Sequence, residues 1–233
     1  MNDFEKIINY TFKDKSLLKQ ALTHSSFINS GGIANERMEF LGDSVLSVVV
    51  SKYLYDNLKS QPEGFLTKLR ANLVCEDALY GYAKKIGLGQ RIAMGKGEEN
   101  TGGRDRKSIL SDAFEALIAA VYLDSCGDND DLEGVRGFII PFLPNKASLK
   151  VIKPLPRDYK TALQELVQQN PSNTICYEQS GEAGSAHEKV FFADVLINGQ
   201  VEGSGRGKSK KESQQQAAKA ALIKRGAISP EQS

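Results

Sequence analysis

Residues that form redox, zinc and histidine-based sites are scarce in this sequence. Its three cysteines, Cys75, Cys126 and Cys176, are odd in number and far apart, and their spacing matches no metal-binding pattern. We therefore expect buried free thiols in a reducing compartment. The two histidines, His24 and His187, lie in opposite halves of the chain, which disfavours a mechanism that needs a histidine pair.

Long apolar runs are also missing. No apolar stretch approaches the roughly eighteen residues of a membrane-spanning helix, and the N-terminus MNDFEKIINYTFKDK lacks the basic-then-apolar order of a signal peptide. We expect a soluble, cytoplasmic protein with no membrane partner. With 233 residues, of which 40% are hydrophobic, the chain can form one sizeable core and a smaller second domain.

The net charge of +1 hides a local excess of cations near the C-terminus. Within 206–225, seven basic residues accompany a single acidic one, Glu212. Such a patch says more about a partner than the overall charge does, and it favours an anionic one.

A break in helical periodicity divides the chain. Three prolines between Leu143 and Tyr159 predict a linker, which we place at 144–156, between an all-α domain (1–143) and a second domain (157–228). The glycine-rich, charged segment GKGEENTGGRDRK (95–107) predicts a mobile surface loop. Apolar periodicity predicts helices in the first domain at 16–28, 35–59, 63–73, 76–86, 108–125 and 131–143.

The second domain has a different pattern. A helix is expected at 159–169, then strands at 174–179, 188–197 and 200–204, with a tight Asn-Gly hairpin turn between the last two. Alanines at helical spacing predict a final helix at 210–225. The order α-β-β-β-α makes this domain α+β, with helices that can cover one face of a three-stranded antiparallel sheet.

Three carboxylates interrupt the apolar helix that contains NERMEFLGDSVL, residues 35–46. Glu36, Glu39 and Asp43 lie at i, i+3 and i+7, within a stripe roughly 60° wide. An isolated E-x-x-E is most often the solvated face of an amphipathic helix. Here, however, the residues that follow are apolar around most of the circumference, and like charges one turn apart repel unless a cation offsets them.

A second helical run, SDAFEALIAAVYLD at 111–124, has the same unusual feature. Asp112 and Glu115 lie at i and i+3 among apolar residues, and burying a carboxylate is unfavourable unless it is paired or binds a metal. Arg37 is the only basic residue inside either run. If the two helices cross at their acidic edges, several oxygens converge into a site that suits Mg²⁺ or Mn²⁺.

These residues carry a resemblance to a known family. NERMEFLGDSVL resembles the signature helix of ribonuclease III, and DAFEALIAAVYLD resembles that family's second acidic helix. LTHSSF (22–27), EGFLTKLRANLV (63–74) and GKGEE (95–99) are similar to family segments in the expected order. The likeness covers essentially the whole chain. Met38, where leucine is usual, and Ala119, where glycine is usual, are packing positions.

The resemblance implies a role for each acidic residue. Glu39, Asp112 and Glu115 would ligate a divalent metal, Mg²⁺ with Mn²⁺ as a possible substitute, and Glu115 would be the most critical. Asp43 would act beside them through metal, water or scissile phosphate, so that Asp43 and Glu115 are the expected catalytic residues. Glu36 would bind substrate or hold the site together.

The resemblance further implies a homodimer whose two sites each cut one strand of double-stranded RNA, leaving 5′-phosphate, 3′-hydroxyl and a short 3′ overhang. The expected cellular roles are processing of rRNA precursors and of mRNA. Phe40 would pack across the dimer interface, although an ordinary core phenylalanine fits the sequence equally well. The chemistry agrees, because Mg²⁺ activates water and acts as a Lewis acid, so that no protein nucleophile is needed.

Residues 157–226 resemble a double-stranded RNA-binding domain. A-form RNA is read by shape, 2′-hydroxyls and backbone over about 16 base pairs, and a helix N-terminus suits phosphate. The likeness implies contacts from the first helix, from the loop between the first two strands and from the start of the last helix. The expected contact residues are Thr161, Gln164, Glu165, His187, Lys208, Lys210 and Lys211.

The RNA contacts each have a simpler alternative. A lysine cluster at the start of a helix is more often simply a solvated face. The positive end of the helix dipole, however, disfavours lysines at this end of a helix. Their presence at the start of the last helix therefore favours an anionic partner. His187 alone would more often be a surface or capping residue.

Two other functions stay open at this point. A catalytically inert double-stranded RNA-binding protein could keep the helical domain for dimerisation. Such a relative would be free to lose an acidic residue, however, and Glu39, Asp43, Asp112 and Glu115 are all present. A deoxyribonuclease with the same metal chemistry is less favoured, since the second domain resembles one that binds RNA.

Overall fold

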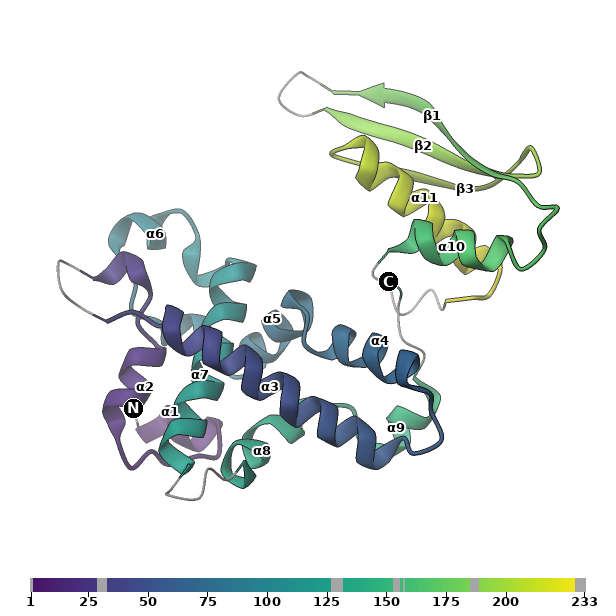
Figure 1. The fold of residues 1–233 in the computed structure, drawn as a ribbon. Coiled ribbons are helices and arrows are strands. Elements are labelled where there is room, and N and C mark those ends of the chain that lie inside the picture. Colours follow the sequence, from purple (N-terminus) through teal and green to yellow (C-terminus); the bar gives the residue numbers. More distant parts are fainter. Residues whose placement is uncertain are drawn as a thin grey trace. The chain divides into compact units, whose positions relative to one another are not determined.

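The structure, a computed structural model, describes residues 2–28, 33–126, 132–152, 156, 158–184 and 189–228. The chain divides into two compact units, Met1–Ile152 and Lys153–Ser233. Figure 1 shows helices in the first unit and a sheet with two helices in the second, which confirms the predicted fold class. His187, one of the predicted RNA contacts, lies outside the described residues.

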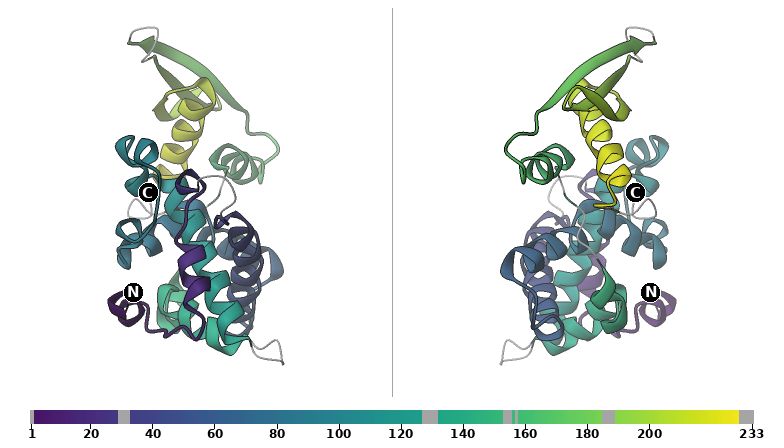
Figure 2. Two further views of the ribbon diagram at one scale, coloured as in Figure 1. Left: turned by 90° about the vertical axis from the view of Figure 1, so that its left-hand side faces the viewer. Right: turned by 90° about the vertical axis from the view of Figure 1, so that its right-hand side faces the viewer.

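Two long helices form the centre of the first unit (Figure 1, Figure 2). α3 (Glu36–Asn57) packs against α7 (Lys107–Ser125), and 12 of the 19 residues of α7 are buried because this helix is apolar around most of its circumference. Shorter helices and 3₁₀ turns surround this pair. They are α1 (Asn2–Ile7), α2 (Lys15–Ala21), η1 (Ser25–Phe27), α4 (Glu63–Leu73), α5 (Glu76–Lys85), η2 (Leu88–Gln90), α6 (Lys96–Asn100), η3 (Gly103–Asp105), α8 (Glu133–Ile139), η4 (Ile140–Phe142) and α9 (Lys146–Val151).

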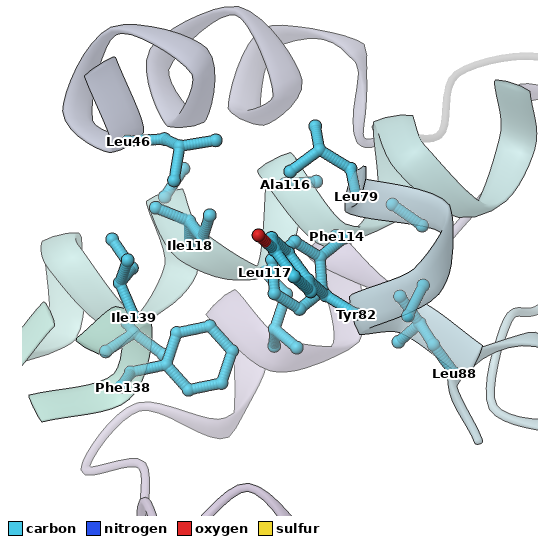
Figure 3. Close-up of a cluster of buried hydrophobic side chains, with 14 of the residues drawn as sticks. Leu46, Leu79, Tyr82, Leu88, Phe114, Ala116, Leu117, Ile118, Phe138 and Ile139 are labelled. Atoms are coloured by element: carbon cyan, nitrogen blue, oxygen red, sulfur yellow. The ribbon is translucent and has the colours of Figure 1, made fainter. Parts of the chain in front are cut away.

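Aromatic side chains pack against α7 in the core of the first unit (Figure 3). The ring of Phe114 packs against those of Tyr82, Phe138 and Phe142, with centroids 5.1 to 5.8 Å apart. Such pairs contribute about 0.5–1.5 kcal/mol each beyond the apolar area they bury. The core therefore holds α7 firmly in place, and with it the acidic edge of this helix.

The N-terminal segment is more ordered than the sequence predicts. Asp124, at the end of α7, accepts hydrogen bonds from the Tyr10 hydroxyl and from the backbone N–H groups of Lys13 and Asp14, at 2.7 to 2.9 Å. These bonds attach the chain that follows α1 to the central helix. The periodicity of so short a helix is too weak to predict, and α1 was therefore not expected.

Two further segments differ from expectation. Segment 95–107, predicted as a mobile loop, contains α6 and η3, because Arg104 pairs with Glu99 at 2.7 Å and Arg106 pairs with Glu98. The range 144–156, predicted as a linker, contains α9, whose Leu149 is buried in the core of the first unit.

The exposure of the cysteines and the character of the helices bear on two further expectations, buried thiols and the lack of a membrane-spanning helix. All three cysteines are free thiols, but Cys75 and Cys126 are only half-buried and Cys176 is exposed. No helix in the described part of the chain combines the length and apolarity needed to cross a membrane.

The second unit is a three-stranded antiparallel sheet in the order β1-β2-β3, with two helices on one face (Figure 1). Its hairpin turn has positive φ at Asn198 (53°) and Gly199 (78°), as the Asn-Gly pair predicts. Gly205 lets a helix approach closely, since a Cβ there would lie 2.2 Å from the Ala217 nitrogen. The elements are α10 (Tyr159–Val167), β1 (Ile175–Ala183), β2 (Val190–Ile197), β3 (Gln200–Gly207) and α11 (Lys210–Lys224).

Candidate active site

Gly42 allows α3 and α7 to approach each other at their acidic residues. A Cβ at position 42 would lie 1.9 Å from the carbonyl oxygen of Glu115, so a side chain there would force the two backbones apart. Gly42 directly precedes Asp43 and follows Glu39 by three residues. The contact therefore places the acidic edges of the two helices side by side.

Three of the predicted site residues meet at this crossing. One carboxylate oxygen from each of Glu39, Asp112 and Glu115 lies within 4.8 Å of the others, and all three side chains are half-buried. Three anionic oxygen ligands at this separation fit a hard divalent cation such as Mg²⁺ or Mn²⁺ and would not suit a soft metal.

The electrostatics of the cluster favour an added positive charge. Burial, together with the charges of Asp43, Glu39 and Asp112, raises the pKa of Glu115 to about 8. Burial followed by the charges of Asp112 and Glu36 raises the pKa of Glu39. Without a cation the cluster therefore tends to retain a proton, and a bound cation would displace it.

Asp43 and Glu36 lie at the exposed margin of the cluster. Both side chains are exposed, and neither belongs to the group of three converging oxygens. Asp43 is nevertheless close enough for its charge to raise the pKa of Glu115, and Glu36 acts in the same way on Glu39. Their position suits contact with an approaching substrate or with its water.

Two residues near Asp112 were not predicted as part of the site. Burial raises the pKa of Asp112, and the charge of Glu76, at the start of α5, adds to this effect. The Ser111 hydroxyl and the charge of His24 oppose it. Neither Glu76 nor His24 belongs to an acidic helical stripe, so sequence spacing gave no signal that tertiary packing brings them here.

The predicted RNA contacts of the second unit lie on its surface. Thr161, Gln164 and Glu165 are exposed on α10 at i, i+3 and i+4, hence on one face of the helix. Gln215 of α11 accepts the Tyr159 N–H at 2.8 Å, which fixes the start of α10 against α11.

The lysines at the start of α11 are exposed, and no ion pair to them is found within the described residues. The nearby carboxylate of Glu212 is already engaged, since it accepts the backbone N–H of Lys208 at 2.7 Å. Ser209 completes the cap by accepting the Glu212 N–H at 3.1 Å. Lys208, Lys210 and Lys211 are thus left available to an anionic partner.

An all-α unit with an acidic helix crossing, followed by a basic α-β-β-β-α unit, defines a class of two-domain proteins that join a nuclease-type carboxylate site to a nucleic-acid-binding module. Comparison with known proteins agrees. The Ribonuclease-III-like family model matches residues 14–138, and the double-stranded RNA binding motif matches residues 159–225.

Similar proteins span nearly the same length. The chain is 52% identical to Ribonuclease 3 of Caldanaerobacter subterraneus over 96% of this chain and 97% of that protein. It is 46% identical to Ribonuclease 3 of Clostridium perfringens over 97% of this chain and 94% of that one. The chain belongs to the ribonuclease III family, which confirms the resemblance seen in the sequence.

Solved structures show the same fold in the first unit. The nuclease domain of ribonuclease III from Campylobacter jejuni superposes with a TM-score of 0.56 at 43% identity and covers 61% of this chain and 92% of that one. A second structure of that domain, at 41% identity and TM-score 0.56, covers 64% and 97% and is described as flexible in a region involved in dimer formation.

Proposed function

We propose that the chain hydrolyses double-stranded RNA at the cluster of Glu39, Asp112 and Glu115, which would together hold a divalent cation, Mg²⁺ foremost. Its family makes the chain an endoribonuclease acting on double-stranded RNA, and the alternative of an inert binding protein is not favoured. The observation that carries the metal assignment is the convergence of three half-buried carboxylates where two buried helices touch.

The chain's own residues would divide the work as follows. When bound, the cation supplies an activated water and neutralises charge on the scissile phosphate. The three carboxylates would hold the cation, and Glu115, whose pKa is raised to about 8 without it, would be ionised in the loaded site. Asp43 and Glu36, at the exposed margin, lie where the reacting water and the RNA backbone would enter. We expect 5′-phosphate and 3′-hydroxyl ends.

The second unit would select the substrate. The exposed face of α10 presents Thr161, Gln164 and Glu165, whose polar groups suit hydrogen bonds to the 2′-hydroxyls of a minor groove. Lys208, Lys210 and Lys211 supply positive charge at the N-terminus of α11, where backbone N–H groups also favour phosphate. The arrangement matches recognition of duplex shape more than recognition of base sequence.

We also propose a homodimer built on α3. Phe40 is 78% exposed and Tyr55 is 70% exposed, which excludes the alternative that Phe40 is an ordinary core residue. With Val48, also exposed, they fall within one stripe about 80° wide along the helix. Large apolar side chains in one exposed stripe mark a protein interface.

In the proposed dimer, Phe40 would enter a hollow at the other end of α3 of the partner protomer. A hollow of about 390 Å³ is lined by Ser51, Leu54, Tyr55 and Leu66, among others. In a two-fold dimer each copy presents the same patch to the other. An axis near the middle of α3 would therefore bring Phe40 of one protomer to this hollow of its partner. Two sites facing opposite strands would leave short 3′ overhangs.

The test of the catalytic assignment is cleavage of a long end-labelled RNA duplex by wild-type protein and by Glu115→Gln. In Mg²⁺ the variant should lose at least about 10³-fold in rate, because one of three anionic ligands becomes neutral. Duplex binding, measured in Ca²⁺, should persist. Glu133→Gln, which changes an exposed carboxylate on α8, is the matched control and should cleave normally.

Further controls separate the possible outcomes. EDTA should stop cleavage, and single-stranded RNA and duplex DNA should remain intact. Cleavage by Glu115→Gln at near wild-type rate would remove the metal assignment. Tight binding of the duplex without cleavage by the wild-type protein would instead favour the alternative function, a catalytically inert double-stranded RNA-binding protein.

A further inference from the structure

Gln215 of α11 forms hydrogen bonds to the start of α10 with both ends of its side-chain amide. Its Oε1 accepts the backbone N–H of Tyr159 at 2.8 Å and that of Lys160 at 3.3 Å. Its Nε2 donates to the Oδ1 of Asp158, the N-cap of α10, at 2.9 Å. One amide group therefore contacts the cap and the first turn of α10 together.

The Asp158 carboxylate connects this amide to the exposed face of α10. Its Oδ1 also accepts the backbone N–H of Thr161 at 3.0 Å, and this bond, followed by the one from Gln215, holds the pKa of Asp158 below its usual range. The carboxylate is thus ionised at neutral pH, which strengthens both bonds. Two hydrogen bonds in series therefore join Thr161, an expected RNA contact, to α11.

Lys160 makes a second link between the two helices. Its ammonium group donates to the Oε1 of Gln214 at 2.7 Å and lies 4.5 Å from the ring centroid of Tyr177 on β1. The Lys160 residue is only half-buried, but its charge is engaged within the unit. This basic residue therefore belongs to the contact between the helices, in contrast to the exposed lysines at the start of α11.

Apolar packing alone leaves the position of α10 along α11 loosely determined. The buried residues of α11 are Ser213, Ala217, Ala218, Ala221 and Leu222. Because alanines present few projections, the packing of Leu163 and Val167 against this face changes little when one helix shifts along the other. Hydrogen bonds, in contrast, weaken steeply with misalignment. The amides of Gln214 and Gln215 therefore set the register of the two helices.

These two amides lie one helical turn from the lysines at the start of α11. Lys210 and Gln214 are at i and i+4, as are Lys211 and Gln215, so each pair shares a face of the helix. A double-stranded RNA-binding module contacts minor grooves and the phosphates across the intervening major groove at the same time. Simultaneous contact requires a fixed distance between its contact elements, and the bonds of Gln215 lie between the two elements.

We propose that Gln215 is a positioning residue for substrate binding, whose amide holds α10 at the distance and orientation from the start of α11 at which both helices contact one RNA duplex. This inference rests on the proposed RNA contacts of the two helices. Gln215 needs no RNA contact of its own, since both ends of its amide are engaged inside the unit. Without these bonds α10 would lose its minor-groove contacts, while the lysines of α11 would keep their phosphate contacts.

The experiment measures the affinity of the full-length chain for an RNA duplex in Ca²⁺ at several salt concentrations. Gln215→Met keeps the length of the side chain and removes its amide. Gln216→Met makes the same change at the neighbouring exposed position and is the matched control. Gln164→Ala removes an expected contact on α10 and is measured alone and together with Gln215→Met.

We expect Gln215→Met to bind the duplex about 3- to 10-fold more weakly than wild type, which is the effect of losing one hydrogen-bonded contact. Its slope of log affinity against log salt should equal that of wild type, because the lysines remain in contact with phosphate. Adding Gln164→Ala should weaken binding no further, since the displaced helix no longer makes that contact. Gln216→Met should bind as wild type does.

Three results would overturn the inference. They are wild-type affinity in Gln215→Met, a lower salt slope in that variant, and a loss of affinity that simply adds to the loss in Gln164→Ala. Unchanged binding both in Gln164→Ala and in the combined Lys210→Ala and Lys211→Ala variant would instead overturn the proposed RNA contacts themselves, and the inference with them.

A pair of substitutions with exchanged charges tests the hydrogen bond to Asp158 directly. Gln215→Glu removes the donor and places a second carboxylate beside Asp158, so it should bind RNA as weakly as Gln215→Met. Combining it with Asp158→Asn supplies a donor from the opposite side and keeps the cap on the Thr161 N–H. The combined variant should regain wild-type affinity. Equal weakening in the single and combined variants would contradict the positioning role.

Discussion

Glu115 is the residue at which burial and charge conflict most strongly. It lies on the most buried helix of the first unit, yet three other carboxylates act on it. Its pKa rises from 4.5 to about 8, so the folded protein binds a proton there that the unfolded chain releases at neutral pH. Above the usual pKa of a glutamate, burial of this carboxyl group therefore lowers the stability of the folded protein.

This conflict predicts the pH dependence of stability in EDTA. Because the folded pKa is raised, the stability associated with Glu115 is fully present below about pH 4.5 and is lost as the pH rises through about 8. Glu115→Gln removes that loss. Its melting temperature should match wild type near pH 5 and exceed it by several degrees near pH 8.5.

The same melting experiment includes a control variant and has an outcome that would contradict the prediction. Glu133→Gln, on an exposed pair with Arg136, should track the wild-type protein at every pH. A constant offset between wild type and Glu115→Gln across the range would show that Glu115 titrates at its ordinary pKa. Added Mn²⁺ should raise the melting temperature of wild type and of Glu133→Gln, and not that of Glu115→Gln.

At this scale, sequence reasoning predicted the carboxylates that lie in acidic stripes on the two long helices, and it did not predict that Glu76 and His24 lie near them. Glu39, Asp112 and Glu115 were predictable because a charged stripe on an apolar helix needs a compensating partner. Glu76 and His24 come from segments whose place beside Asp112 depends on packing. No local pattern distinguishes them from surface residues.

Among the elements, α11 combines structural and binding roles at its first turn. Ser209 and Glu212 satisfy backbone N–H groups, and this engages the carboxylate that lies in the same first turn as Lys210 and Lys211. The start of the helix is therefore both capped and left with uncompensated positive charge. A bound phosphate would contact the lysines and the helix terminus at once.

We predict that Lys210→Ala combined with Lys211→Ala weakens binding to an RNA duplex and lowers its salt dependence. If both lysines contact phosphate, the slope of log affinity against log salt should fall by up to about 2. The matched control is Lys224→Ala with Arg225→Ala, at the other end of α11, where both side chains pair with Glu202.

Binding titrations at several salt concentrations measure the slope of log affinity against log salt for each variant. The control pair should retain the wild-type slope. An unchanged slope in the Lys210 and Lys211 variant would remove these residues from the interface, even if affinity fell somewhat.

The boundaries of elements followed from local chemistry where caps were present. α10 begins after Asp158 and α11 after Ser209, and both side chains accept a backbone N–H of the first turn, so the predicted starts at 159 and 210 are confirmed. α6 was missed because ion pairs from Arg104 and Arg106 stabilise it, and these arise from residues outside the helix.

For the whole molecule, the proposed homodimer predicts the mass of the protein in solution. Mutating Phe40 to glutamate should give a monomer of 25.5 kDa where wild type gives twice that mass, because a charge would have to enter the hollow at the end of α3. Light scattering after size-exclusion chromatography measures this directly.

Phe27 provides the comparison for this test. It is also an exposed phenylalanine, at 55%, but it lies on η1 and not on the stripe of α3. Phe27→Glu should leave the dimer intact. Dissociation by both variants, or by neither, would contradict the assignment of the α3 face. Sequence could not choose between core and surface for Phe40, because an apolar residue beside a buried stripe fits either.

Gly42 has a consequence for how freely the sequence of this protein can change. Since α3 and α7 touch there through main-chain atoms, the spacing between Glu39 and Glu115 is set by backbone dimensions and not by the size of a side chain. A change of side-chain volume at a neighbouring interior position such as Met38 or Ala119 should then disturb the packing of the core more than the distance between these two carboxylates. Substitutions that change only core packing and substitutions that disrupt the carboxylate cluster can therefore lie within one helical turn of each other.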